Sequence, residues 1–196
     1  MRAALEQSVA QRLLRTLPKD RFQHVMGVTD LAGKLADAHK MDPVRARIAG
    51  ILHDMARCWK NKQLVQYALK HHLKVPQFEF VREYQPVLIH SYVSAHMART
   101  LFRVTDPEIL SAIEKHSTGA VDMTKFEKLI FLADLLAPDR TFSGANKLRV
   151  MARKDLDKAF VEALRIKMEY LLKTHSIIHP DAVKIWNAHA PETGRA

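Results

Sequence analysis

Apolar residues recur at helical spacing in one segment after another, and an Asp-Pro pair opens two of these segments. Asp42-Pro43 and Asp106-Pro107 each combine a side chain that caps a helix N-terminus with a proline suited to the first helical turn. Only 6 of the 196 residues are glycine. These features predict an all-α protein folded as a single helical bundle.

The predicted helices follow each other without a linker, an internal repeat or a low-complexity stretch. We expect a single domain over residues 1–196, with a loop at 73–84 and with Asp122 as the cap of the helix that reaches Leu136. The expected helices cover about 3–17, 21–39, 43–55, 62–72, 86–101, 107–116, 122–136 and 155–174, with a short one from about residue 180.

Composition excludes several classes of protein. A single cysteine, Cys58, rules out a disulfide framework and favours the reducing cytoplasm. No run of about 18 apolar residues exists, so we expect no membrane-spanning helix. The 31 Lys and Arg against 21 Asp and Glu give a net charge of +10, which attracts anions such as phosphorylated metabolites, nucleic acid or acidic membranes. Eight methionines and scattered apolar positions would permit a homodimer.

Asp134 is the only polar residue in the nine-residue stretch Leu129–Ala137. A lone carboxylate in a core must be paired, hydrogen-bonded or bound to a metal, because burying an isolated charge is too costly. The alternative is an exposed aspartate on the polar face of an amphipathic helix. The apolar residues on all sides of Asp134 weigh against that alternative.

His24 and the pair His53-Asp54 also lie beside apolar stretches. Taken singly, each is explained by a core histidine or by a histidine near a helix C-terminus. Together with Asp134 they provide two imidazoles and two carboxylates, a donor set that suits iron, manganese or zinc. His90 and His116 would supply a second ion, with Asp54 as a candidate bridge, and a metal pair can hold a phosphate and activate water.

Five sequence blocks then occur in a characteristic order: HVMGVTDLAGKLA (24–36), ARIAGILHDMAR (46–57), LIHSYVSAHMA (88–98), AIEKHSTG (112–119) and LIFLADLLAPDR (129–140). This series resembles the YqeK-like group of the HD-domain phosphohydrolase superfamily. The resemblance implies a helical HD domain that uses iron to hydrolyse diadenosine tetraphosphate symmetrically to two ADP. It also implies a metal-binding core at about 21–140 and C-terminal helices at 141–190 that complete the substrate pocket.

The resemblance also implies roles for individual residues. His24, His53, Asp54 and Asp134 would bind one iron, while His90 and His116 would bind a second metal or contact phosphate. The implied catalytic residues are Asp54, Arg57, His90 and His116, and the implied substrate-binding residues are Arg21, Asp54, Arg57, His90, His116, Thr118, Gly119, Asp134, Arg140, His179 and Pro180. The family usually has glutamate before the proline of the last block, where this chain has Ala137.

We therefore expect a metal-dependent hydrolase in which a metal-activated water attacks a central phosphorus of the tetraphosphate. Iron is the expected metal, as one or two ions, with manganese or another divalent ion as the alternative. The expected partner is a small nucleotide, without nucleic acid or membrane. Other interpretations are a different HD-type nucleotide or cyclic-nucleotide phosphohydrolase, a basic RNA-associated helical protein, and a purely structural helical protein.

Overall fold

Helices make up all of the regular secondary structure in the part of the chain that the computed structural model describes, which is the backbone of residues 2–190 and the side chains of residues 6–190. The all-α prediction is confirmed. The helices are α1 (Arg2–Thr16), α2 (Lys19–Ala38), α3 (Pro43–Leu52), α4 (Asn61–Lys70), α5 (Phe78–Tyr84), the 3₁₀ turn η1 (Pro86–Leu88), α6 (Ile89–Leu101), α7 (Pro107–Lys115), α8 (Lys125–Leu135), α9 (Ala145–Lys154), α10 (Leu156–Lys173) and α11 (Pro180–His189).

The two Asp-Pro pairs cap helices as predicted. Asp42 Oδ1 accepts hydrogen bonds from the backbone N–H groups of Val44 (2.8 Å) and Arg45 (3.2 Å) at the start of α3. Asp106 Oδ1 accepts from Glu108 N at 3.0 Å at the start of α7. Each aspartate satisfies backbone donors that have no partner within the helix.

Two predictions about the helices are wrong. Part of the expected loop at 73–84 forms α5, which follows a left-handed residue, Gln77 (φ 52°), and turns Val81 into a buried position. Thr124, not Asp122, caps α8: its hydroxyl accepts from Glu127 N at 3.2 Å, and the Glu127 side chain accepts from Thr124 N at 2.8 Å. Helix α9 was not among the expected helices.

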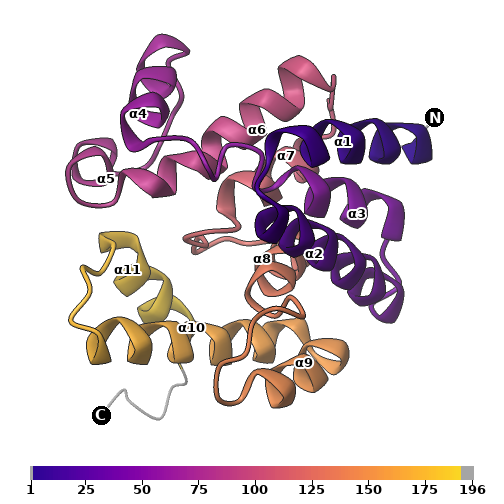
Figure 1. The fold of residues 1–196 in the computed structure, drawn as a ribbon. Coiled ribbons are helices and arrows are strands. Elements are labelled where there is room, and N and C mark those ends of the chain that lie inside the picture. Colours follow the sequence, from indigo (N-terminus) through magenta and orange to yellow (C-terminus); the bar gives the residue numbers. More distant parts are fainter. Residues whose placement is uncertain (1, 191–196) are drawn as a thin grey trace.

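Helices α2, α3 and α8 pack against one another, and Figure 1 shows α9, α10 and α11 below them and α4 and α5 projecting at the upper left. A Cβ at Gly50 of α3 would lie only 3.0 Å from Cα of Thr29 on α2, so these two helices approach closely because Gly50 has no side chain. A second, smaller group of buried apolar residues joins α4, α5 and α6. Among the described residues, no helix is long and apolar enough to cross a membrane.

The segment after α8 is held by a single guanidinium from α9. Arg149 donates to the backbone carbonyl oxygens of Leu136 (Nε, 2.8 Å), Ala137 (Nη2, 2.9 Å) and Arg140 (Nη2, 2.7 Å). These carbonyls lie at and beyond the C-terminal end of a helix, where they have no helical partner. Arg149 therefore fixes the path of the chain between Asp134 and Arg140.

Candidate metal centre

His53 lies at the C-terminal end of α3 and is completely buried. Its Nδ1 lies 2.6 Å from the carbonyl oxygen of Gly50, three residues earlier. A carbonyl oxygen can only accept, so Nδ1 carries the proton and Nε2 presents a lone pair. That Nε2 atom is buried and has no hydrogen-bond partner.

The same arrangement recurs at two other histidines. His90 Nδ1 lies 2.6 Å from the carbonyl oxygen of Val87, and His116 Nδ1 lies 2.7 Å from that of Ile113. Both side chains are buried, and their Nε2 atoms face each other at 3.2 Å. Three imidazoles from three different helix ends are thus oriented by backbone carbonyls, with their unprotonated nitrogens pointing to a common centre.

Asp54 lies at the centre of these nitrogens. Its Oδ1 is 3.0 Å from His90 Nε2 and 3.6 Å from His116 Nε2, and its Oδ2 is 3.5 Å from His53 Nε2. Arg21 of α2 donates to Oδ2 at 2.9 Å. The carboxylate therefore connects the three imidazoles and has one cationic partner.

Asp134 approaches the same centre from the last turn of α8. Its Oδ1 lies 3.0 Å from His24 Nε2, 3.9 Å from His53 Nε2 and 3.5 Å from the Arg140 guanidinium. Its side chain is 20% exposed, so Asp134 is neither solvated on a polar face nor isolated in the core. We call His24, His53, Asp54, His90, His116 and Asp134 the central cluster.

The electrostatics of the cluster follow from burial and from the opposite charges. Burial lowers the pKa of His53 to about 4, although Asp54 opposes this shift. Burial also lowers the pKa of His90. Burial alone would raise the pKa of Asp54, but the neighbouring imidazoles of His53, His116 and His90 hold it well below its usual range. Burial would lower the pKa of His24 and His116 too, but Asp134 and Asp139 act on His24 and Asp54 acts on His116, so both pKa values are raised. Metal binding requires neutral imidazoles beside ionised carboxylates, so an ion would displace protons from these two histidines.

The residues present fit a divalent metal. Two sets of three residues each bring their ligand atoms within 4.8 Å of one another. The sets are His24–His53–Asp134 and His53–Asp54–His116, and His53 belongs to both. All the donors are nitrogen or oxygen, a set typical of iron, manganese or zinc. The unpartnered Nε2 atom of His53 is explained by such an ion, because a buried acceptor without a partner is costly.

Two residues of the site were not identified from the sequence. Asp139 Oδ2 lies 2.9 Å from His24 Nδ1. A carboxylate in this position orients the ring of a histidine whose other nitrogen binds a metal. The Ser117 hydroxyl lies 3.3 Å from His90 Nε2 and 3.1 Å from His116 Nε2. Asp139 stands one residue before Arg140 in a block that was singled out, so a second carboxylate close to Asp134 was an available signal.

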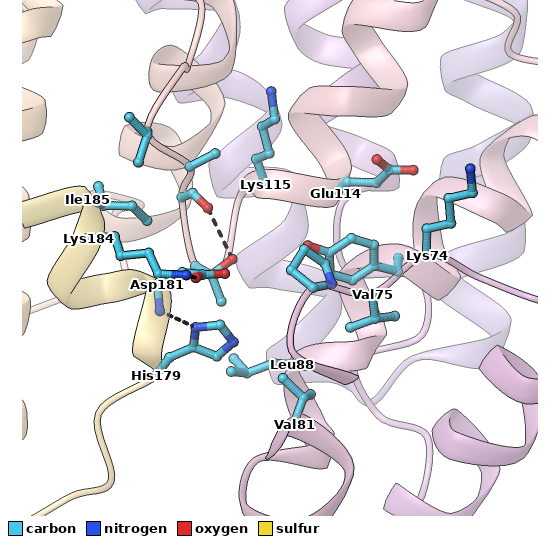
Figure 2. A pocket seen from close by; sticks show the side chains of 16 residues that line it. Lys74, Val75, Val81, Leu88, Glu114, Lys115, His179, Asp181, Lys184 and Ile185 are labelled. Atoms are coloured by element: carbon cyan, nitrogen blue, oxygen red, sulfur yellow. Dashed lines mark hydrogen bonds and ion pairs between the residues drawn. The ribbon is translucent and has the colours of Figure 1, made fainter. Parts of the chain in front are cut away.

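The other predicted site residues lie outside the central cluster. Thr118, Gly119 and His179 line a pocket of about 300 Å³, and His179 accepts from Asp181 N at 3.1 Å. Figure 2 shows the ring of His179, the residue that caps α11, beside Leu88. Pro180 opens α11 next to His179. Arg57 is half-buried after α3, and its side chain makes no hydrogen bond or ion pair with the described residues.

Comparison with known proteins places this geometry in a family. Residues 21–139 match the HD domain family. A protein of Halalkalibacterium halodurans named "Bis(5'-nucleosyl)-tetraphosphatase, symmetrical" is 33% identical over 87% of this chain and 89% of its own length. A protein of the same name from Bacillus subtilis is 32% identical over 87% of this chain and 90% of its own length.

A solved structure from Clostridium acetobutylicum has the same fold. It is described as a predicted HD superfamily hydrolase involved in NAD metabolism, and its TM-score is 0.86 at 28% identity, over 93% of this chain and 95% of that one. The match spans both the central cluster and the C-terminal helices. This chain therefore belongs to the HD-domain family, in the group of its relatives named symmetrical bis(5'-nucleosyl)-tetraphosphatases.

Proposed function

We propose that this protein hydrolyses diadenosine tetraphosphate symmetrically to two ADP, with a divalent metal bound by His24, His53, Asp54 and Asp134. The observation that carries the proposal is the convergence of backbone-oriented imidazole Nε2 atoms on two carboxylates, with the Nε2 atom of His53 left unpartnered. The relatives that match most of the chain support the choice of substrate.

A bound divalent metal supplies a Lewis acid that offsets phosphoryl charge and makes water more acidic. The donor set of nitrogen and oxygen supports iron, with manganese or another divalent ion as the alternative. His90 and His116 either hold a second ion or contact a phosphate oxygen. Ser117 is within hydrogen-bond distance of both nitrogens and keeps them on the same side of the site.

Cationic side chains of the chain itself contact the phosphates. Arg140 is 43% exposed and 3.5 Å from Asp134, so its guanidinium borders the cluster and remains accessible to a ligand. Arg21 borders the cluster at its other carboxylate, Asp54, to which its guanidinium donates a hydrogen bond. A guanidinium binds phosphate oxygens in bidentate fashion. Arg57, which has no partner among the described residues, is a third candidate contact.

One nucleoside of the substrate occupies the pocket of about 300 Å³ that Thr118, Gly119 and His179 line. That volume is at the lower end of the range for small-molecule sites. Its walls combine apolar side chains such as Leu88 and Ile185 with a few polar groups, a composition suited to a nucleoside. Pro180 supports this wall because it fixes the start of α11 beside His179.

The test is a product assay on anaerobically purified protein supplied with ferrous iron and diadenosine tetraphosphate. ADP as the only product is the expected result. ATP plus AMP would contradict symmetrical cleavage, and no turnover by protein that contains metal would exclude this substrate. Asp134→Ala is the matched control, because loss of this carboxylate removes a metal ligand while leaving the pocket residues in place.

A further inference from the structure

Lys167 of α10 is a cation without a counter-ion. Its Nζ donates to the backbone carbonyl oxygen of Ser117 at 2.8 Å and lies 4.7 Å from the centre of the Phe131 ring. It makes no ion pair with any described residue. An ammonium group has three donors, so two of them have no acceptor among residues 6–190.

The surroundings of Lys167 disfavour its charge. Burial lowers the pKa of Lys167, the negative charge of Asp134 opposes the shift, and the positive charge of Arg140 adds to it. Asp134 is already engaged by His24 at 3.0 Å. Lys167 is only partly buried, so the donors of its ammonium group that the protein does not use are open to an anionic ligand.

Lys167 lines a small pocket of about 130 Å³ together with Ser117, whose hydroxyl lies 3.3 Å from His90 Nε2 of the central cluster. Thr118 and His179 also line the pocket, and most of the remaining wall is apolar, with Leu164 and Met168 of α10 among its residues. Its volume is well below the roughly 300 Å³ at which small-molecule sites begin, so it suits one phosphate group better than a nucleoside. Thr118 and His179 line the larger pocket as well, which makes the two spaces neighbours.

We propose that Lys167, together with Ser117 and Thr118, binds one phosphate group of the substrate on the α10 side of the central cluster. The identity of the substrate rests on the proposed function, whereas the unused donors of Lys167 are a feature of the structure itself. Arg21 reaches the cluster from α2 and Arg140 from the segment after α8. Lys167 adds a cation from a helix outside residues 21–139, the part that matches the HD domain family.

The competing explanation is structural. Ser117 follows the C-terminal end of α7, where unpaired carbonyls attract cations, and Lys167 could serve only to hold this segment. The two explanations differ in what the loss of the charge changes. A structural role affects the stability of the fold, and a ligand role affects the affinity for a phosphorylated ligand.

The experiment measures ADP binding to the metal-loaded protein by calorimetry for the wild type, Lys167→Met and Lys167→Arg. Lys158→Met is the matched control, since Lys158 lies on the same helix and its side chain is 80% exposed. We expect Lys167→Met to weaken ADP binding at least ~10-fold, as for the loss of one charged hydrogen bond. Lys167→Arg, which keeps the charge, should stay within about threefold of the wild type, and Lys158→Met should not differ from it.

ADP affinity that is unchanged in Lys167→Met, with a lower melting temperature, would overturn the proposal in favour of the structural role. Equal losses in Lys167→Met and Lys158→Met would overturn it as well, because net charge alone would then explain them. If Lys167→Met does not fold, Lys167→Gln replaces it. ADP binding that depends on Lys167, in a protein that does not hydrolyse diadenosine tetraphosphate, would refute the proposed function and leave this inference standing.

Discussion

Two groups of histidines in this molecule have the same ring spacing and different chemistry. In the central cluster the ring centres of His53 and His116 are 4.8 Å apart, and on the surface between α4 and α6 those of His71 and His96 are also 4.8 Å apart. We call the second group, with Tyr67, the outlying cluster. Its polar contact is that of His96 Nδ1 with the Tyr67 hydroxyl at 3.0 Å.

The difference lies in what surrounds the rings. In the central cluster, backbone carbonyls hold the Nδ1 atoms and two carboxylates face the Nε2 atoms. In the outlying cluster, neither histidine forms an ion pair with a described carboxylate, and the charges of His71 and Arg99 lower the pKa of His96 further after burial has lowered it. Adjacent imidazoles alone are therefore not a metal site, because orientation and negative charge are also required.

The largest effect should come from Asp54→Ala. The variant removes the carboxylate that connects three imidazoles, so we expect loss of bound metal and a fall in turnover of at least ~10³-fold. Metal analysis and product formation measure both. His96→Ala, in the outlying cluster, should keep full metal content, and a comparable loss of metal there would break the distinction between the clusters.

A smaller effect is expected from Asp139→Asn. Asp139 is 2.9 Å from His24 Nδ1, and its side chain is 49% exposed, so the substitution should leave folding intact. Loss of the charge that orients a ligating histidine typically weakens metal affinity about 10–100-fold. Competition with a chelator measures this affinity, and a value equal to that of the wild type would show that Asp139 does not support His24.

Gly50→Ala tests whether backbone position orients His53. The new Cβ would lie 3.0 Å from Cα of Thr29. We expect this overpacking to lower the free energy of unfolding by about 1–3 kcal/mol. Because Gly50 also supplies the carbonyl that holds His53, metal content should fall as well. Gly144→Ala is the control: at φ 87°, with nothing within 4 Å, it should lower the melting temperature without lowering metal content.

The smallest effect is a pH dependence of the outlying cluster. The pKa of His96 is lower in the folded protein than its ordinary value of about 6.5, so the unfolded chain binds more protons. The folded protein therefore becomes less stable as the pH falls below about 6.5. Between about pH 7.5 and 5.5, the melting temperature of His96→Gln should fall less than that of the wild type. His72→Gln controls for the removal of an exposed histidine, and parallel curves for all three proteins would contradict this expectation.

Local signals in the sequence were sufficient for most helices. Asp42 and Asp106 act within a few residues of themselves, and so their caps were predictable. Thr124 and Glu127 form a Thr-x-x-Glu capping box. This pattern is visible in the sequence and is a stronger signal for the start of α8 than Asp122 alone. Helix α5 has no side-chain cap, and its burial depends on contacts with other elements, which no local pattern reveals.

The site was predictable to a different degree. The ordered blocks pointed to the ligands, because each block carries its own histidine or aspartate. Asp139 lies in one of these blocks, but its contact with His24 spans 115 residues of chain, and Lys167, outside the blocks, contacts Ser117 across 50 residues. Such contacts follow from the packing of helices rather than from spacing along the sequence.

Arg149 holds the segment after α8 only through backbone carbonyl oxygens, so this segment can tolerate changes of side chain. Every residue has a backbone carbonyl oxygen, whatever its side chain. The hydrogen bonds that Arg149 donates to Leu136, Ala137 and Arg140 therefore do not depend on the side chains at these three positions. The family that this chain resembles usually has glutamate where this chain has the completely buried Ala137. A different side chain at residue 137 would therefore leave these three hydrogen bonds available, and with them the course of the segment that carries Asp139 and Arg140.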